Sequence, residues 1–191
     1  MNGKKNVEPI IDFQALSNLL KSASRPDTYY AIVNAPFANK LQAVLLYLGF
    51  ICLYILDEKS KEVCLVAVSG TEEYHLSIEG FKFDPADYRL SFGKDKNNQI
   101  IKAIISETQQ CTTDWTTLNR GDTPEETVRL NQANSGIACT VIEPFVGPIR
   151  GALMFNYYQY REKLGAEQVD FMKQYFGLVS DYLVKRQSNI V

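Results

Sequence analysis

One stretch, Ile137 to Tyr182, decides the fold of this chain, and it reads IACTVIEPFVGPIRGALMFNYYQYREKLGAEQVDFMKQYFGLVSDY. Its first apolar run ends at a turn that contains Pro144, Gly147 and Pro148, and its second apolar run begins near Gly151. Two apolar runs joined by a short turn predict an antiparallel hairpin. The helical pattern that follows predicts a helix that covers one face of that hairpin.

An earlier pair of apolar segments predicts a second hairpin. Gly49 to Asp57 is almost entirely aliphatic, aromatic or β-branched, so both faces of its pleat are apolar, which is typical of a strand in the middle of a sheet. After the charged turn Glu58 to Lys61, Glu62 to Ser69 repeats the pattern. The two hairpins together predict an α+β fold, a central antiparallel sheet with helices on both faces.

The helices that would cover the sheet lie at the two ends of the chain. Helical spacing predicts a short helix over Phe13 to Leu20 and a longer one from about Asp27 to Leu48, which Pro36 should kink or split. Gly165 to Arg186 should form a closing helix with two apolar rows, one for the sheet and one for another helix. The first row is Val169, Met172, Phe176, Val179 and Leu183, and the second is Phe171, Tyr175, Leu178 and Tyr182.

The middle of the chain carries weaker signals. Tyr88 to Phe92 can form a short strand and Gln99 to Glu107 a short helix. Thr123, Pro124 and Glu126 match a capping box with proline at the first helical position, so a helix is expected from Pro124 to about Ala133.

Length and composition limit the class of protein. A chain of 191 residues favours one domain, with residues 1–26 as an N-terminal helical extension and 27–191 as the domain proper. The net charge of −2 and the lack of a Lys/Arg cluster exclude a nucleic-acid binder, and no apolar run is long enough to span a membrane. Met1 to Glu8 is polar and no signal core follows it, which favours a cytoplasmic location.

The residue types exclude most catalytic centres. His75 is the one histidine in the chain, so no Ser/His/Asp or Cys/His/Asn arrangement can form without it, and a zinc site with two or more histidines is excluded. Its neighbours Glu72, Glu73 and Tyr74 favour a solvent-facing loop over a haem ligand. No Gly-rich phosphate loop occurs. Cys52, Cys64 and Cys139 lie in apolar strand patterns and are expected to be buried free thiols. We therefore expect no catalytic residues, no metal, no cofactor and no enzymatic activity.

Element order and local patterns together resemble a GAF domain, a sensor module distantly related to PAS domains. The resemblance covers roughly Asp27 to Leu183. Its most specific pieces are Ser135 to Pro144 and the segment Ile149 to Met154, which is similar to the family's I-x-G-x-L return strand. The other matching pieces are the leading helix, the strands Phe50 to Leu56 and Val63 to Ser69 with Gly70, the helix Ile100 to Ile105, and Cys111 to Asp114.

The resemblance implies a sheet of about five or six strands with the first and last helices on one side and the middle segment on the other. A ligand pocket would lie under that middle segment. Family members that bind bilin often carry a Cys-His pair, and those that bind cyclic nucleotides carry an Asn-Lys-x-x-Phe-x-x-x-Asp-Glu signature. This chain has no adjacent Cys and His, and its Asn39-Lys40 is followed by apolar residues, so neither pattern is matched. Other members reduce free methionine sulfoxide with cysteines beside the pocket. A thiol enzyme of that kind, using Cys111, is therefore the alternative to a non-enzymatic sensor.

The resemblance also indicates which residues would bind the ligand and what partners to expect. Residues around the capped helix would lie over the pocket and suit a small polar ligand. A homodimer through the terminal helices, with Val169 to Leu183 as the seam and Phe13 to Leu20 as its partner, would transmit binding to a separate effector protein. The predicted ligand-binding residues are Asp114, Trp115, Arg120, Arg129, Gln132, Asn134 and Ser135.

Overall fold

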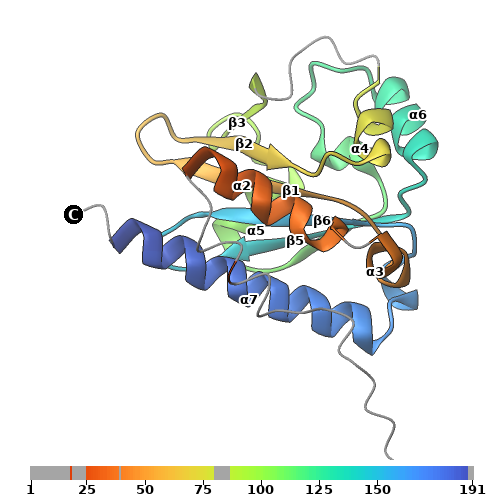
Figure 1. Cartoon of the computed structure of the whole chain (residues 1–191). Coiled ribbons are helices and arrows are strands. Elements are labelled where there is room, and N and C mark those ends of the chain that lie inside the picture. Colours follow the sequence, from red (N-terminus) through yellow and green to blue (C-terminus); the bar gives the residue numbers. More distant parts are fainter. Residues whose placement is uncertain (1–17, 19–24, 39, 80–86, 189–191) are drawn as a thin grey trace, which may run out of the picture.

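The protein is built around one six-stranded antiparallel sheet (Figure 1). The computed structural model describes residue 18 and residues 25–38, 40–79 and 87–188. The strand order across the sheet is β3-β2-β1-β6-β5-β4. The strands are β1 (Leu48–Asp57), β2 (Glu62–Val68), β3 (Arg89–Ser91), β4 (Gln110–Thr112), β5 (Cys139–Phe145) and β6 (Gly151–Tyr157).

The strand β1 lies in the middle of the sheet, between β2 and β6, as its two apolar faces predicted. Alternate side chains of β1 enter two separate hydrophobic cores. Ile51 and Leu53 face one core, while Phe50, Cys52 and Tyr54 face the other. The predicted α+β fold class, with cover on both faces of the sheet, is confirmed.

Gly151 permits the close contact between β1 and β6. A Cβ atom at this position would lie 2.1 Å from the backbone oxygen of Tyr54, which is far inside van der Waals contact. Gly151 pairs with Ile55 in the antiparallel register, and the amide of Leu56 donates to the carbonyl of Arg150. The glycine of the I-x-G-x-L pattern is therefore required by backbone packing.

The first face is covered by α2 (Arg25–Asn34) and α7 (Ala166–Ser188), which cross the same side of the sheet (Figure 1). Pro36 splits the leading helix as predicted, because the chain continues as a 3₁₀ turn, η1 (Ala35–Phe37), and then as α3 (Lys40–Leu45). The prediction of a helix to Leu48 was wrong, since that residue already belongs to β1.

Both apolar rows of α7 enter the same core as α2. Met172, Val179 and Leu183 from the first row and Phe171 and Tyr175 from the second are buried there. Tyr175 of the second row donates to the carbonyl of Ile32 on α2, and Phe176 of the first row stacks on Phe145 of β5, as the expected division of the rows implies. Both contacts belong to one core that α2, α7 and the sheet share. The apolar seam predicted for a dimer is thus used within the chain.

A glutamine caps the start of α7. The backbone amide of Gly165 donates to Oε1 of Gln168 (2.9 Å), and Nε2 of the same glutamine donates to the carbonyl of Leu45 (2.9 Å). This side chain satisfies an amide ahead of the first helical turn and ties α7 to the end of α3. The absence of Ser, Thr or Asp at the cap position is therefore compensated.

The second face is covered by α4 (Glu72–Ser77), α5 (Gln99–Ser106), the 3₁₀ turn η3 (Trp115–Leu118) and α6 (Glu125–Ser135). The expected strand near Arg89 and helix near Gln99 are both present. The prediction of a capping box at Thr123 was wrong: Pro124 is itself the N-cap, the first helical residue is Glu125, and no side chain in the described ranges caps the helix. His75 was assigned to a loop, but it lies exposed on α4.

Two further predictions concern the N-terminal helix and the division of the chain into an extension and a domain. The helix expected over Phe13 to Leu20 falls mostly outside the described residues. The division into an extension (1–26) and a domain (27–191) stays a prediction. In the described part of the chain, no helix combines the length and apolarity needed to cross a lipid bilayer.

Candidate ligand-binding pocket

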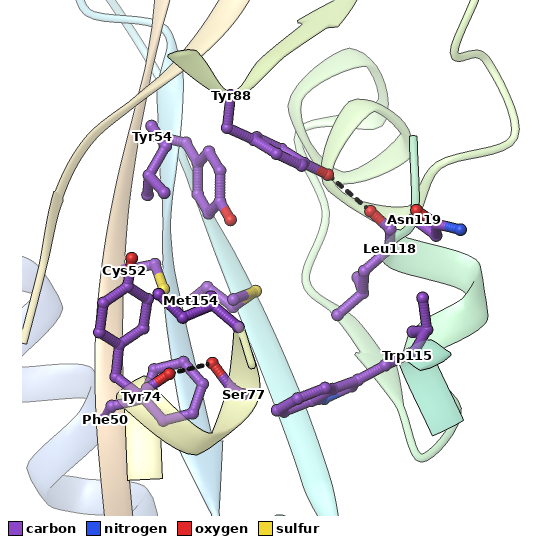
Figure 2. A pocket seen from close by; sticks show the side chains of 13 residues that line it. Phe50, Cys52, Tyr54, Tyr74, Ser77, Tyr88, Trp115, Leu118, Asn119 and Met154 are labelled. Carbon is purple, nitrogen blue, oxygen red and sulfur yellow. Dashed lines mark hydrogen bonds between the residues drawn. The ribbon is translucent and has the colours of Figure 1, made fainter. Parts of the chain in front are cut away.

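A pocket of about 100 Å³ lies between the second face of the sheet and the segments that cover it (Figure 2). Side chains from β1 and β6 form one wall, and side chains from α4, η3 and α6 form the other. In Figure 2, Tyr54 and Met154 point from the sheet toward the space that Leu118 and Trp115 border from the opposite side. The lining is Phe50, Cys52, Tyr54, Leu65, Tyr74, Ser77, Ile78, Tyr88, Trp115, Leu118, Asn119, Val128 and Met154.

Aromatic rings give the pocket its shape. Phe50 makes edge contacts with both Tyr74 and Trp115, at ring-centroid distances of 5.9 and 6.0 Å. Tyr54 makes a similar contact with Tyr88 at 6.2 Å. Edge-to-face pairs at these distances are favourable and fix the ring orientations. The pocket is therefore bordered by rings that support one another.

The hydroxyl groups around the pocket largely bind the protein itself. Tyr88 donates to the carbonyl of Leu118 (2.8 Å), and Ser77 donates to the carbonyl of Tyr74 (2.6 Å). Burial raises the pKa values of Cys52, Tyr54 and Tyr88, so these groups are neutral at pH 7. No acidic, basic or histidine side chain belongs to the described lining, which is uncharged.

Trp115 is held in place by two elements. Its backbone amide donates to Oε1 of Gln132 on α6 (3.0 Å), and its indole Nε1 donates to Oγ1 of Thr140 on β5 (2.8 Å). Thr140 in turn donates to Oδ1 of Asn156 on β6 (2.7 Å). The indole N–H is therefore used inside the protein, and the ring offers its apolar surface to the pocket.

The structure places the seven predicted binding residues around α6 and η3, and one of them, Trp115, lines the pocket. Gln132 and Ser135 hold the covering segment together: Gln132 donates to the carbonyls of Thr113 and Ile137, and Ser135 donates to the carbonyl of Gln132. Trp115 and Ser135 are thus joined through one glutamine. These contacts give Gln132 and Ser135 a supporting position around the pocket.

The charged residues of the set lie at the surface. Asp114 caps η3 by accepting from the amide and hydroxyl of Thr116, and these bonds hold its pKa below the usual value although partial burial opposes the shift. Arg129 lies 3.6 Å from the Asp114 carboxylate. Arg120 pairs with Asp122 and stacks over Tyr88, while Asn134 is exposed on α6. Their role in ligand binding stays a prediction.

The cysteines occupy three kinds of position. Cys52 is buried in the pocket wall and Cys139 is buried in the first core, as predicted, whereas Cys64 is only half-buried. Cys111 is exposed on the edge strand β4, and no residue near it in sequence revealed that its Sγ lies 3.2 Å from Sγ of Cys139. No group of three or more His, Cys, Asp and Glu side chains suited to a metal ion occurs within the described ranges.

Comparison with solved structures identifies the fold. A GAF domain from an Acinetobacter phosphoenolpyruvate-protein phosphotransferase superposes with a TM-score of 0.57 at 12% identity, over 92% of this chain and 92% of that one. The fold is that of a GAF domain. Residues 122 to 287 of a methyl-accepting chemotaxis protein also match, with a TM-score of 0.60, 16% identity and coverage of 89% and 95%.

An enzyme is among the similar structures as well. The free methionine-R-sulfoxide reductase from Neisseria meningitidis, solved with its substrate, matches with a TM-score of 0.54, 11% identity and coverage of 92% and 88%. No protein-family model matches the sequence. No curated protein sequence matches it either. At identities of 11 to 16%, these matches establish the GAF fold but not an activity, which has to be argued from the residues of the pocket.

Sequence reasoning missed most of the GAF-domain pocket for a physical reason. Phe50, Cys52 and Tyr54 alternate along a strand whose two faces are equally apolar, so nothing in the sequence separates the wall of a cavity from a filled core. The helix α4, which supplies Tyr74 and Ser77, is only six residues long and shows no clear helical periodicity. One local signal was available: Thr71 followed by two glutamates is a helix start, and its hydroxyl accepts from the amide of Tyr74.

Proposed function

We propose that this GAF-fold chain is a non-enzymatic sensory or regulatory domain that binds a small, uncharged and mostly apolar molecule. The observation that carries this proposal is the pocket lining, in which aromatic and aliphatic surface surrounds a few neutral polar atoms. Such an environment favours neutral ligands, because an ion placed there would lose its hydration without gaining a partner charge. A neutral ring compound suits the pocket better than the polar ligand expected from the sequence.

The size of the pocket supports a compact ligand. At about 100 Å³ it is smaller than the cavities that take drug-sized molecules. An apolar cavity of roughly 150 Å³ in another protein accepts benzene. A single ring or a short branched chain therefore matches the space between Trp115, Tyr54 and Met154, and a nucleotide or a bilin does not.

The thiols favour binding over catalysis in this pocket. A reductase acting on a sulfoxide needs a thiolate beside its substrate. The thiol in the pocket wall is Cys52, and burial raises its pKa, which keeps it protonated. Cys111, the cysteine of the alternative hypothesis, is absent from the described lining. Free methionine sulfoxide should therefore not be turned over in this cavity.

Signal output would run through the terminal helices to a separate effector protein in the cytoplasm. The described part of α7 buries side chains of both apolar rows in the core that it shares with α2 and the sheet, so a homodimer would have to use the outer faces of the terminal helices. Native mass spectrometry of the full chain, purified from its own host, measures the subunit count and any retained ligand together. A dimer peak and a retained neutral compound are the expected result.

Ligand class is tested with three probes of one ring size: benzyl alcohol, benzoate and benzylamine. We expect benzyl alcohol to raise the melting temperature and change the fluorescence of Trp115, which is the one tryptophan in the chain, while both ions have no effect. Equal stabilisation by benzoate or benzylamine, or no response to benzyl alcohol, would contradict the proposal.

A matched pair of variants assigns the effect to the pocket. Leu118→Phe adds a ring to the pocket lining and should abolish the response to benzyl alcohol. Leu130→Phe makes the same change at an exposed position on α6 and should leave the response intact. Loss of the response in both variants would place the binding elsewhere.

A further inference from the structure

Two thiols from neighbouring strands lie close together at the edge of the sheet. Sγ of Cys111 on β4 and Sγ of Cys139 on β5 are 3.2 Å apart. In the antiparallel register Cys111 pairs with Val141, so Cys139 is the diagonal neighbour two residues away and points to the same face. Cys111 is exposed, whereas Cys139 is fully buried. Reagents in solution can therefore reach the sulfur of Cys111, whereas the sulfur of Cys139 is accessible only to Cys111.

The thiol pair and the ligand pocket lie on opposite faces of the sheet. Cys139 pairs with Tyr157, and both belong to the core on the α2 and α7 side. The next residue along β5, Thr140, contacts Trp115 of the pocket on the other side. The pair is thus a site separate from the pocket.

The surroundings of Cys111 favour its thiolate. The hydrogen bond from Cys139 lowers the pKa of Cys111 to about 7, with a smaller contribution from the Arg161 guanidinium and opposition from partial burial and Glu162. The same hydrogen bond, together with burial, raises the pKa of Cys139. Cys111 is accordingly the nucleophile of the pair, and Cys139 is the proton-bearing partner.

We propose that Cys111 and Cys139 form a two-thiol site that hydrogen peroxide oxidises to an intramolecular disulfide. In the first step the Cys111 thiolate attacks one peroxide oxygen, an S–O bond forms, the O–O bond breaks, and the leaving hydroxide takes a proton to become water. In the second step Cys139 sulfur attacks Cys111 sulfur, the S–O bond breaks, and the departing hydroxide takes the Cys139 proton as a second water. Two thiols lose two electrons to one peroxide.

The position of the pair suits a small oxidant. Hydrogen peroxide needs access to Cys111 alone, whereas a bulky disulfide that exchanges with Cys139 would have to enter the core. The strand β4 is three residues long and lies at the sheet edge, so closing the distance to the roughly 2.05 Å of a disulfide bond disturbs one short ladder. An exposed low-pKa cysteine next to a resolving cysteine is the arrangement that reactive redox sites share.

The test is oxidation of the reduced full chain with hydrogen peroxide, followed by denaturing thiol titration and peptide mass spectrometry. We expect the titrated thiols to fall from four to two, a peptide linking Cys111 to Cys139, and recovery of all four thiols after dithiothreitol. Cys111→Ser should lower the rate of thiol loss at least tenfold, while Cys64→Ser, at the half-buried thiol of β2, should leave the disulfide unchanged.

Variants of the buried cysteine separate the two steps. Cys139→Ala and Cys139→Ser should both stop at a sulfenic acid that dimedone traps on Cys111, so a folding defect in one variant leaves the other informative. A disulfide between different chains, oxidation of Cys64 as fast as Cys111, or an unchanged rate in Cys111→Ser would each overturn the proposal.

Discussion

The indole of Trp115 and the hydroxyl of Thr140 are joined by a 2.8 Å hydrogen bond that links the pocket wall formed by η3 to β5. The Thr140 hydroxyl donates to Oδ1 of Asn156 (2.7 Å), and Nδ2 of Asn156 donates to the carbonyl of Phe50 (3.3 Å). This chain of bonds crosses three strands inside a fully buried region. It fixes the pocket tryptophan to the centre of the sheet.

Removing the Thr140 hydroxyl, which lies in the middle of this series of hydrogen bonds, should destabilise the protein. Thr140→Val leaves the indole N–H and the Asn156 oxygen without their partner, and we expect a loss of about 2 kcal/mol in the free energy of unfolding. Urea denaturation measures the loss, and the emission of Trp115 should shift as its ring is released. The exposed Thr113→Val is the control and should change stability by less than about 0.5 kcal/mol.

Two glycines should respond in opposite directions to the same substitution. Gly151→Ala places a Cβ 2.1 Å from the Tyr54 oxygen and should cost about 2 kcal/mol or more as β1 and β6 separate. Gly177 lies in the middle of α7, where an added Cβ would meet no packed side chain or other segment of the described chain within 4 Å, so Gly177→Ala should stabilise by about 0.5 to 1 kcal/mol. Thermal melts of the two variants compare them directly; a shift of the same sign in both would contradict the packing described for Gly151.

Two buried tyrosines differ in whether their hydroxyl has a partner. Among the described residues, the buried Tyr157 hydroxyl has no hydrogen-bond partner, so Tyr157→Phe should be neutral or stabilising by up to about 1 kcal/mol. Tyr175 donates to the carbonyl of Ile32 on α2, so Tyr175→Phe should cost about 1 kcal/mol. Chemical denaturation of both variants is the measurement, and a larger loss for Tyr157→Phe would show that its hydroxyl is bonded in solution.

The pH dependence of alkylation should separate Cys111 from Cys64. The thiolate is the reacting form, so a pKa lowered to about 7 means that iodoacetamide labels Cys111 at half its maximal rate near pH 7. Partial burial raises the pKa of Cys64, so its labelling rate should still be climbing at about pH 9. Peptide mass spectrometry follows both sites in one sample.

The donor role of Cys139 predicts the behaviour of one variant in the same assay. Cys139→Ala removes the hydrogen bond that is the main cause of the lowered pKa, so the labelling curve of Cys111 should move to higher pH. Arg161 and Glu162 remain as the nearby charges and act in opposite directions. A curve that stays at pH 7 in this variant would assign the shift to another group.

The fold was largely predictable because its strongest elements are periodic and long. The two-faced strand β1, the hairpin partners and the closing helix all carry apolar patterns that only a covered antiparallel sheet can bury. The errors came from local competition: Pro124 takes the N-cap place expected for Thr123, and α4 is too short to show a period.

The pocket and the thiol pair were less predictable because both depend on contacts between distant residues. Polar residues near α6 were expected to bind a ligand. The side-chain amide of Gln132 instead accepts from the backbone of Trp115 and donates to the carbonyls of Thr113 and Ile137. The environment of Cys111 arises from Cys139, 28 residues away, and from Arg161 on a later turn. Sequence spacing contains no trace of either relationship.

The alternation of side chains along β5 has one more consequence. Cys139 and Thr140 are consecutive, so a single peptide unit separates the sulfur chemistry from the residue that anchors the tryptophan. If oxidation of the two thiols changes the affinity of the cavity for its ligand, thermodynamic linkage requires the bound ligand to change the reduction potential of the thiols by the same free energy. Measuring that potential with and without bound ligand would show whether the sites on the two faces of the sheet are energetically coupled.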